Sequence, residues 1–127
     1  MTQSATRAAQ TALFALDGRT ALITGGGTGI GLQCARTLGR AGARVILSAR
    51  RQPVLDDAVA ALGAEAIDAV AVAMDVSEAA SIEAAFGAAG GAGVDILVNN
   101  AGTASDAMLA DLDDDGWSRV METNVRG

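Results

Sequence analysis

Four short apolar runs, separated by stretches with helical spacing, constrain the fold of this chain most strongly. The runs are Thr20–Thr24, Arg44–Ser48, Ala69–Met74 and Val94–Asn99. They show little alternation of polar and apolar residues, which indicates strands buried on both faces of a parallel sheet. Four successive strand–helix units with right-handed crossovers predict an α/β fold, a doubly wound parallel sheet of four strands with about four helices.

The segments between the runs carry helix signals. In the stretch 30–41, apolar residues recur four apart and predict one buried face: Ile30, Cys34 and Leu38. A second helix is expected over 53–63, opened by proline and closed by glycine. Ser77 is predicted to cap a third helix. A fourth is expected to start near Asp113 and to include Trp117, which we expect to pack in the core or between subunits.

The composition excludes several functions. The chain has 127 residues and a net charge of -6, and its nine basic residues are all Arg. Without His, a Ser-His-Asp or Cys-His site within the chain is excluded, and without Lys so are a Schiff base and a P-loop. A single Cys cannot form an internal disulfide, which favours a reducing, cytoplasmic location. The acidic balance argues against nucleic acid or an anionic membrane as the main partner.

A glycine-rich loop follows the first predicted strand and leads into a helix. Its glycines fit the pattern T-G-x-x-x-G-x-G, with Gly25, Gly29 and Gly31 at the fixed positions. Glycines allow a tight turn there and let backbone N–H groups approach a pyrophosphate at the helix start. The loop therefore predicts nucleotide binding; the alternative is a glycine-rich turn that binds nothing.

The end of the second predicted strand indicates which nucleotide would bind. An Asp or Glu at this place would bind the ribose 2′-hydroxyl of NAD. This chain instead has Ser48, Arg50 and Arg51. A guanidinium pairs with a 2′-phosphate that a carboxylate would repel, so we predict NADP(H) rather than NAD(H). The alternative is that the two arginines are simply solvated at a strand end.

These motifs together resemble the short-chain dehydrogenase/reductase family. The resemblance runs from about Leu16 to Gly127 and is most similar to gluconate 5-dehydrogenase-like and 3-oxoacyl-reductase-like members. It rests on TGGGTGIG at 24–31, Asp75-Val76, Asn99-Asn100-Ala101-Gly102, and Asn124 in NVRG at 124–127. It implies a partial Rossmann-type dinucleotide-binding domain over 16–127, without the family's catalytic half, preceded by a flexible tail over 1–15.

The resemblance also implies a role for each matched residue. The pyrophosphate and nicotinamide would be approached by Gly25, Thr28, Gly29, Ile30 and Gly31. The 2′-phosphate would be held by Arg50, with Ser48 and Arg51. The adenine would contact Asp75 and Val76, and the fourth strand and the ribose would be supported by Asn99, Ala101 and Gly102. Asn124 matches the family's active-site Asn, which positions a water and a catalytic lysine.

Each of these roles has a structural alternative. Asp75 would then only cap the turn before Ser77, the motif 99–102 would be an ordinary strand-exit turn, and Asn124 would be an exposed helix residue.

The chain departs from the family in its chemistry. The family uses a Tyr as general acid/base, a Lys that lowers its pKa and a Ser that orients the carbonyl, and this chain contains neither Tyr nor Lys. The resemblance thus implies an oxidoreductase acting on a small-molecule alcohol/carbonyl pair, of which this chain supplies the cofactor-binding half and is inactive alone. The family also implies a homo-oligomer. The alternative is a non-catalytic nucleotide-binding or dimerising module, which the predicted bare edge of the fourth strand favours.

One competing motif points to a metal. Residues Asp111–Glu122 satisfy the EF-hand pattern D-x-[DN]-x-[DN]-G-x₅-E. Against it, Ser118 occupies a position that is normally aliphatic, and apolar residues continue at helical spacing from Trp117. Acidic residues in a first helical turn also complement the helix dipole without a metal. We therefore predict no metal site.

Overall fold

The computed structural model describes residues 3, 9, 11–88 and 93–127. It contains one parallel sheet in the order β3-β2-β1-β4, which confirms the predicted doubly wound α/β fold. The strands are β1 (Thr20–Thr24), β2 (Arg44–Ala49), β3 (Ala69–Ala73) and β4 (Ile96–Val98). Most of the predicted tail 1–15 lies outside the described residues, so the predicted domain limits stay a prediction.

The strand register gathers the loops of the site at one edge. β1 lies between β2 and β4, with Thr24 opposite Ser48 and Ile23 opposite Val98. All pairs are parallel, so the carboxyl ends of neighbouring strands, and the loops that follow them, meet at the same edge of the sheet.

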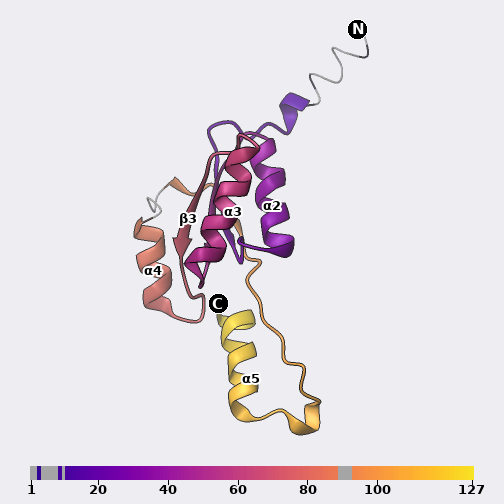
Figure 1. Cartoon of the computed structure of the whole chain (residues 1–127), viewed down its shortest axis with the longest axis vertical. Coiled ribbons are helices and arrows are strands. Elements are labelled where there is room, and N and C mark those ends of the chain that lie inside the picture. The colour runs from indigo at the N-terminus through magenta and orange to yellow at the C-terminus, as the bar shows by residue number, and fades with distance from the viewer. Residues whose placement is uncertain (1–2, 4–8, 10, 89–92) are drawn as a thin grey trace.

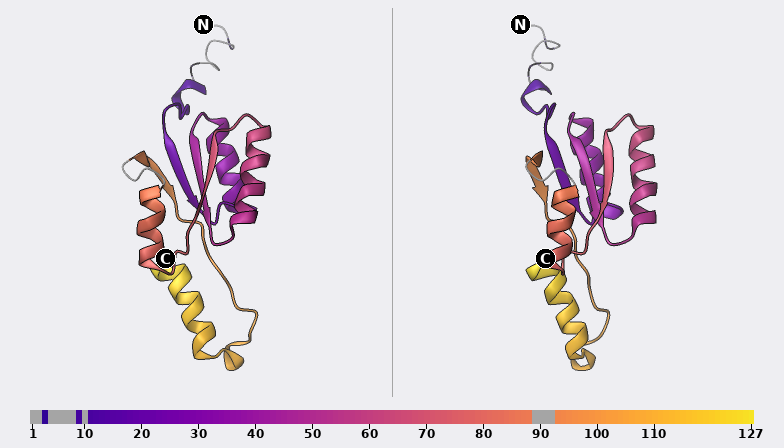
Figure 2. Two further views of the ribbon diagram at one scale, coloured as in Figure 1. Left: turned by 60° about the vertical axis from the view of Figure 1, so that its left-hand side comes forward. Right: turned by 90° about the vertical axis from the view of Figure 1, so that its left-hand side faces the viewer.

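Helices cover both faces of the sheet. The α-helices are α2 (Gly29–Arg40), α3 (Gln52–Ala64), α4 (Ala79–Ala88) and α5 (Asp114–Met121), with a short 3₁₀ turn η2 (Leu109–Asp111) and a π turn η3 (Glu122–Arg126). Figure 2 shows α2 and α3 together on one face and α4 on the other. Figure 1 shows that α5 projects away from the sheet, beyond the carboxyl ends of the strands. Within the described residues, no helix has the length and apolar composition needed to cross a membrane.

The core lies between the sheet and the pair α2 and α3. Its fully buried side chains come from β1, β2, α2 and α3, among them Ile23, Ala35, Leu47, Leu55 and Leu62.

The predicted buried face of α2 is wrong at two of its three positions, whereas Leu38 is partly buried and packs against the core. Ile30 is 77% exposed and Cys34 is only half-buried, whereas Gly31 and Ala35 face the sheet. Small residues face the sheet because the helix start packs directly on the glycine loop, which leaves no room for a larger side chain.

Two strand ends also differ from expectation. β3 ends at Ala73, although the Met74 N–H still donates to the Ala49 carbonyl at 2.9 Å. β4 is shorter than predicted and covers three residues. The Asp95 carboxylate just before it accepts the Thr20 N–H at 2.8 Å and forms an ion pair with Arg19 at 3.3 Å.

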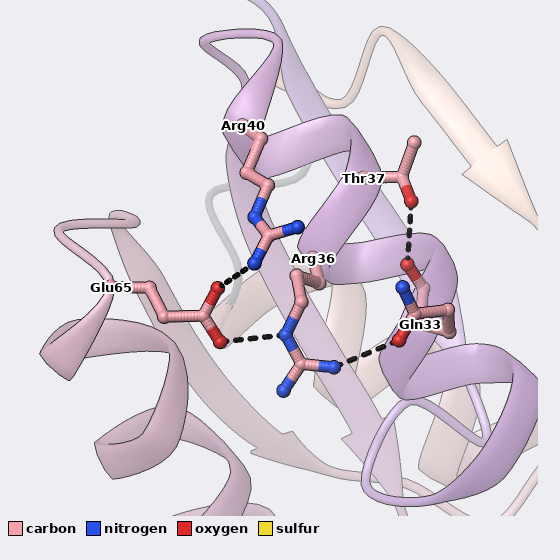
Figure 3. Close-up of polar contacts among 5 residues, drawn as sticks. All are labelled: Gln33, Arg36, Thr37, Arg40 and Glu65. Carbon is pink, nitrogen blue, oxygen red and sulfur yellow. Dashed lines mark hydrogen bonds and ion pairs between the residues drawn. The ribbon is translucent and has the colours of Figure 1, made fainter.

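One carboxylate joins α2 to the end of α3. The two oxygens of Glu65 accept from Arg36 Nε at 2.6 Å and from Arg40 at 2.7 Å, and Arg36 also donates to Gln33 at 2.9 Å (Figure 3). The hydrogen bonds from the two guanidinium groups lower the pKa of Glu65 below its usual value of 4.5. A lowered folded-state pKa means that folding favours the charged carboxylate, so this contribution is present near neutral pH.

We predict that Glu65→Gln flattens the acid side of the stability profile. In the wild type, the contribution of Glu65 is lost as pH falls below about 4.5, through the folded-state pKa. Urea unfolding between neutral pH and pH 3 measures this loss. Glu83→Gln on the exposed surface of α4 removes a carboxylate without such partners and serves as control; an equal change in both variants would contradict the prediction.

Candidate functional site

A cavity of about 210 Å³ opens at the carboxyl edge of the sheet. Every strand contributes to it through the loop that follows. The residues that line it are Gly25, Gly27, Thr28, Ser48, Ala49, Arg50, Arg51, Val54, Met74, Asp75, Val76, Ala101, Gly102, Thr103 and Thr123. Most of the predicted cofactor residues therefore meet in one place, although Gly29, Ile30, Gly31 and Asn99 do not line it.

The glycine loop brings the start of α2 to the cavity. Gly25 and Gly29 adopt φ values of +63° and +53°, in the left-handed region that favours glycine. Thr28 precedes the helix, but its side chain makes no capping hydrogen bond, and the first turn carries no acidic residue. The twelve-residue helix thus begins directly after the cavity-lining Thr28, and the Thr28 side chain leaves its first N–H groups uncapped, an arrangement that suits an anion.

Gly31 permits the close contact between α2 and two loops. A Cβ at this position would overlap the Gly25 carbonyl oxygen and would lie 2.5 Å from Asn100 Nδ2. The third glycine of the motif therefore acts on packing, whereas Gly25 and Gly27 line the cavity.

A buried hydroxyl joins the loops after β1 and β4. Thr24 is 5% exposed, and its Oγ1 accepts the N–H groups of Asn100 at 3.0 Å and Ala101 at 2.9 Å, while donating to the Val98 carbonyl at 3.4 Å. The Asn100 amide in turn donates to the Thr24 carbonyl at 3.0 Å and to the Gly25 carbonyl at 3.3 Å. We call this pair the Thr24–Asn100 junction.

Sequence reasoning missed both members of the junction. It assigned support of the fourth strand to Asn99, whose side chain is exposed, with no hydrogen bond among the described residues, whereas Asn100 makes the contacts. A polar residue at the end of each of two buried strands was the available signal, since buried polar side chains need partners.

The end of β2 supplies unpaired hydrogen-bonding groups. The Ser48 side chain is 1% exposed, and its Oγ has no hydrogen-bond partner among the described residues. Within the described residues, Arg50, Arg51 and Arg119 form no ion pair, whereas the arginines at 19, 36, 40, 44 and 126 do; of the three without one, only Arg50 and Arg51 line the cavity. An unsatisfied buried hydroxyl is costly, so its position against the cavity suits a polar ligand.

The loop after β3 holds Asp75 in a fixed turn. Asp75 Oδ1 accepts from the Ser77 hydroxyl at 2.6 Å and from the Ser77 N–H at 3.0 Å. These two bonds, and to a smaller extent the charge of Arg50, lower the pKa of Asp75, although burial opposes the shift. The predicted capping of the third helix by Ser77 is wrong, because this turn uses its hydroxyl and α4 begins at Ala79.

Asn124 fastens the last turn of the chain to the loop after β4. Its Oδ1 accepts the Thr103 N–H and its Nδ2 donates to the Thr103 carbonyl, both at 2.8 Å. Asn124 itself is exposed and does not line the cavity, but its neighbour Thr123 does.

The acidic segment has the geometry of a helix start. Asp113 Oδ1 accepts the Gly116 N–H at 2.7 Å, and residues Asp114–Met121 are helical where a calcium loop would have to be extended. Within the described residues, no group of three or more potential ligands could hold a metal ion. Trp117 is 55% exposed, so the expectation that it packs in the core is wrong.

A parallel sheet in this order, with a glycine loop that opens α2, has the architecture of Rossmann-type α/β proteins. The family model for short chain dehydrogenase matches residues 19–127. The chain therefore belongs to the short-chain dehydrogenase family, as the resemblance predicted.

Among curated relatives, the chain is 42% identical over 116 residues to galactitol 2-dehydrogenase (L-tagatose-forming) of Cereibacter sphaeroides, covering 91% of this chain and 45% of that protein. It is 38% identical over 120 residues to gluconate 5-dehydrogenase of Gluconobacter oxydans, covering 89% and 45%. The chain thus spans less than half the length of these relatives.

Solved structures show the same extent of similarity. A gluconate 5-dehydrogenase from Burkholderia cenocepacia in complex with NADP and tartrate superposes with a TM-score of 0.82 at 40% identity, covering 92% of this chain and 47% of that one. The Pseudomonas aeruginosa RhlG/NADP active-site complex gives a TM-score of 0.81 at 42% identity, covering 88% and 44%.

We predict that Thr24→Val destabilises the fold and loosens the loop after β4. The isosteric valine leaves the N–H groups of Asn100 and Ala101 without their acceptor, at a cost of about 1 to 3 kcal/mol. Urea unfolding measures the loss. Thr37→Val is the control, because its hydroxyl donates only to the Gln33 carbonyl on the exposed surface of α2; equal stability of the Thr24 variant and the wild type would refute the role of the junction.

Proposed function

We propose that this chain is the cofactor-binding part of an NADP(H)-dependent oxidoreductase that acts on a small-molecule alcohol/carbonyl pair. The observation that carries the proposal is the set of unpaired groups at the end of β2. A buried hydroxyl and two guanidinium groups, none of which has a partner within the part of the chain that the structure describes, line one cavity. A 2′-phosphate supplies both the acceptor oxygens and the negative charge that these groups lack.

The remaining cavity residues fit the other parts of the cofactor. The N–H groups of the glycine loop at Gly25 and Thr28 suit the pyrophosphate, and Asp75 with Val76 suits the adenine. Ala101 and Gly102 line the same cavity, which supports a role in binding the ribose, whereas Ile30 is exposed at the start of α2 and its proposed approach to the nicotinamide has no support from the cavity lining. The cofactor supplies the hydride of the reaction; the residues of this chain bind it and orient it.

Proton transfer requires groups that this chain does not contain. It has no Tyr and no Lys, so we infer that it binds cofactor without reducing a carbonyl by itself. Asn124 contributes by holding Thr103, and through it the loop after β4, in place beside the cavity. In a protein as long as the curated relatives, the rest of the chain would supply the substrate pocket and the proton donor.

We predict that the chain binds NADPH more tightly than NADH, and that Arg50→Gln removes most of this preference. Losing one charge-assisted contact to a phosphate costs roughly 1.5 to 3 kcal/mol, or about tenfold or more in affinity for NADPH. Titration calorimetry with both nucleotides measures the two dissociation constants. Arg44→Gln, at the opposite edge of the sheet, is the control; an equal loss for NADPH and NADH in the Arg50 variant would overturn the assignment of the 2′-phosphate.

A second candidate function, homo-oligomerisation, is favoured by the segment 108–126, which we call the α5 limb. The limb projects away from the sheet (Figure 1) and exposes large apolar side chains: Met108, Leu109, Trp117 and Val125. When several large apolar side chains are exposed on one segment, that surface is more often an interaction site than a surface that remains in water.

We predict that Trp117→Ser lowers the oligomeric state. Sedimentation velocity over a range of protein concentrations should show association of the wild type and a shift toward monomer in the variant. Leu13→Ser, which removes another exposed apolar side chain outside the limb, serves as control. A wild type that stays monomeric throughout would remove this candidate.

A further inference from the structure

The phosphate-binding residues proposed above have a negative charge beside them. Arg50 and Asp75 line the same cavity, from the ends of neighbouring strands. The register places them together, because Ala49 pairs with Ala73 and the next residue, Met74, donates to the Ala49 carbonyl at 2.9 Å. Adjacent strands lie about 5 Å apart, so Arg50 is level with Met74 and Asp75 follows one residue later, and both residues line the cavity.

The Asp75 carboxylate is held in place and remains partly unsatisfied. Both of its hydrogen bonds, from the hydroxyl and the N–H of Ser77, go to Oδ1, and Oδ2 has no hydrogen-bond partner among the described residues. The backbone N–H of Asp75 donates to Ser81 Oγ at 2.9 Å, which fixes the turn from the other side. The charge therefore cannot swing away from the cavity without breaking this turn.

Arg50 is attracted to this charge but is not paired with it. No ion pair joins the two side chains, yet the charge of Arg50 contributes to the lowered pKa of Asp75. An incoming phosphate must therefore compete with a fixed carboxylate for the guanidinium, and must approach that carboxylate against like-charge repulsion.

We propose that Asp75 is a specificity-determining residue that competes with the 2′-phosphate for Arg50 and so limits the preference of the site for NADPH over NADH. This rests on the proposed function, because it needs a site that binds the nucleotide. The carboxylate lowers the affinity for NADPH more than the affinity for NADH. The preference for NADPH is therefore smaller than Ser48, Arg50 and Arg51 would produce without Asp75.

The test is the ratio of dissociation constants, Kd for NADH over Kd for NADPH, in wild type and in Asp75→Asn. Asparagine keeps an Oδ1 acceptor for the Ser77 N–H and hydroxyl, removes the charge and replaces Oδ2 with an amide donor; a gain from that donor alone would be the same in both Arg50 backgrounds. We expect the ratio to rise by about threefold, as for one screened charge at a partly exposed site. In the Arg50→Gln background, Asp75→Asn should raise the ratio less, because the guanidinium for which Asp75 and the 2′-phosphate compete is absent.

Controls separate this proposal from the proposed function. Asp68→Asn also removes one negative charge, but at the opposite edge of the sheet, where Asp68 lies 3.7 Å from Arg44, and should leave the ratio unchanged. A wild type that binds neither nucleotide would overturn the proposed function. A wild type that prefers NADPH, with an unchanged ratio in Asp75→Asn or the same rise in both Arg50 backgrounds, would overturn the competition alone. Thermal unfolding with and without NADPH confirms that each variant is folded.

Discussion

The hydroxyl of Thr24 is the contact on which the site depends. β1 and β4 are adjacent in the sheet, yet Thr24 and Asn100 are separated by 76 residues in the chain. Main-chain pairing brings the two strands together but leaves the loops beyond them undefined. The buried hydroxyl satisfies two N–H groups of the second loop, and the Asn100 amide returns two bonds to the first, so both loops take one conformation. The junction thereby fixes Gly25 and Ala101, the neighbouring residues that line the cavity.

The distribution of charge separates the site from the rest of the surface. Away from the cavity, most of the described arginines are paired with carboxylates: Glu65 binds two of them and Asp95 binds another, whereas Arg119 on α5 forms no ion pair within the described residues. These pairs hold α2 to α3 and close the amino edge of the sheet. At the carboxyl edge, Arg50 and Arg51 remain without such partners, although the chain as a whole is acidic. The same residue type thus forms ion pairs with carboxylates away from the cavity and stays without them, within the described residues, at the cavity.

The sequence predicted the architecture well because its signals are local and repeated. Apolar runs identify buried strands, and a glycine loop between a strand and a helix has few interpretations. The errors fall where tertiary contacts decide the outcome. Spacing alone could not show that α2 turns Gly31 and Ala35 toward the sheet, because that orientation follows from contact with the glycine loop. The predicted cap at Ser77 is wrong because the Ser77 hydroxyl donates to Asp75 instead. The prediction named Asn99 and not Asn100, because two adjacent asparagines differ only in the face of the strand on which they lie, which the sequence alone does not show.

The brevity of β4 has a consequence for how the sheet meets other chains. In the described structure it forms one margin of the sheet and covers only three residues. So short a segment offers a foreign strand very few main-chain bonds, too few to offset the entropy lost on docking, and Asp95 places a charge directly before it. Within the described residues, short length and an adjacent carboxylate both disfavour the addition of a further strand at this margin by main-chain pairing alone.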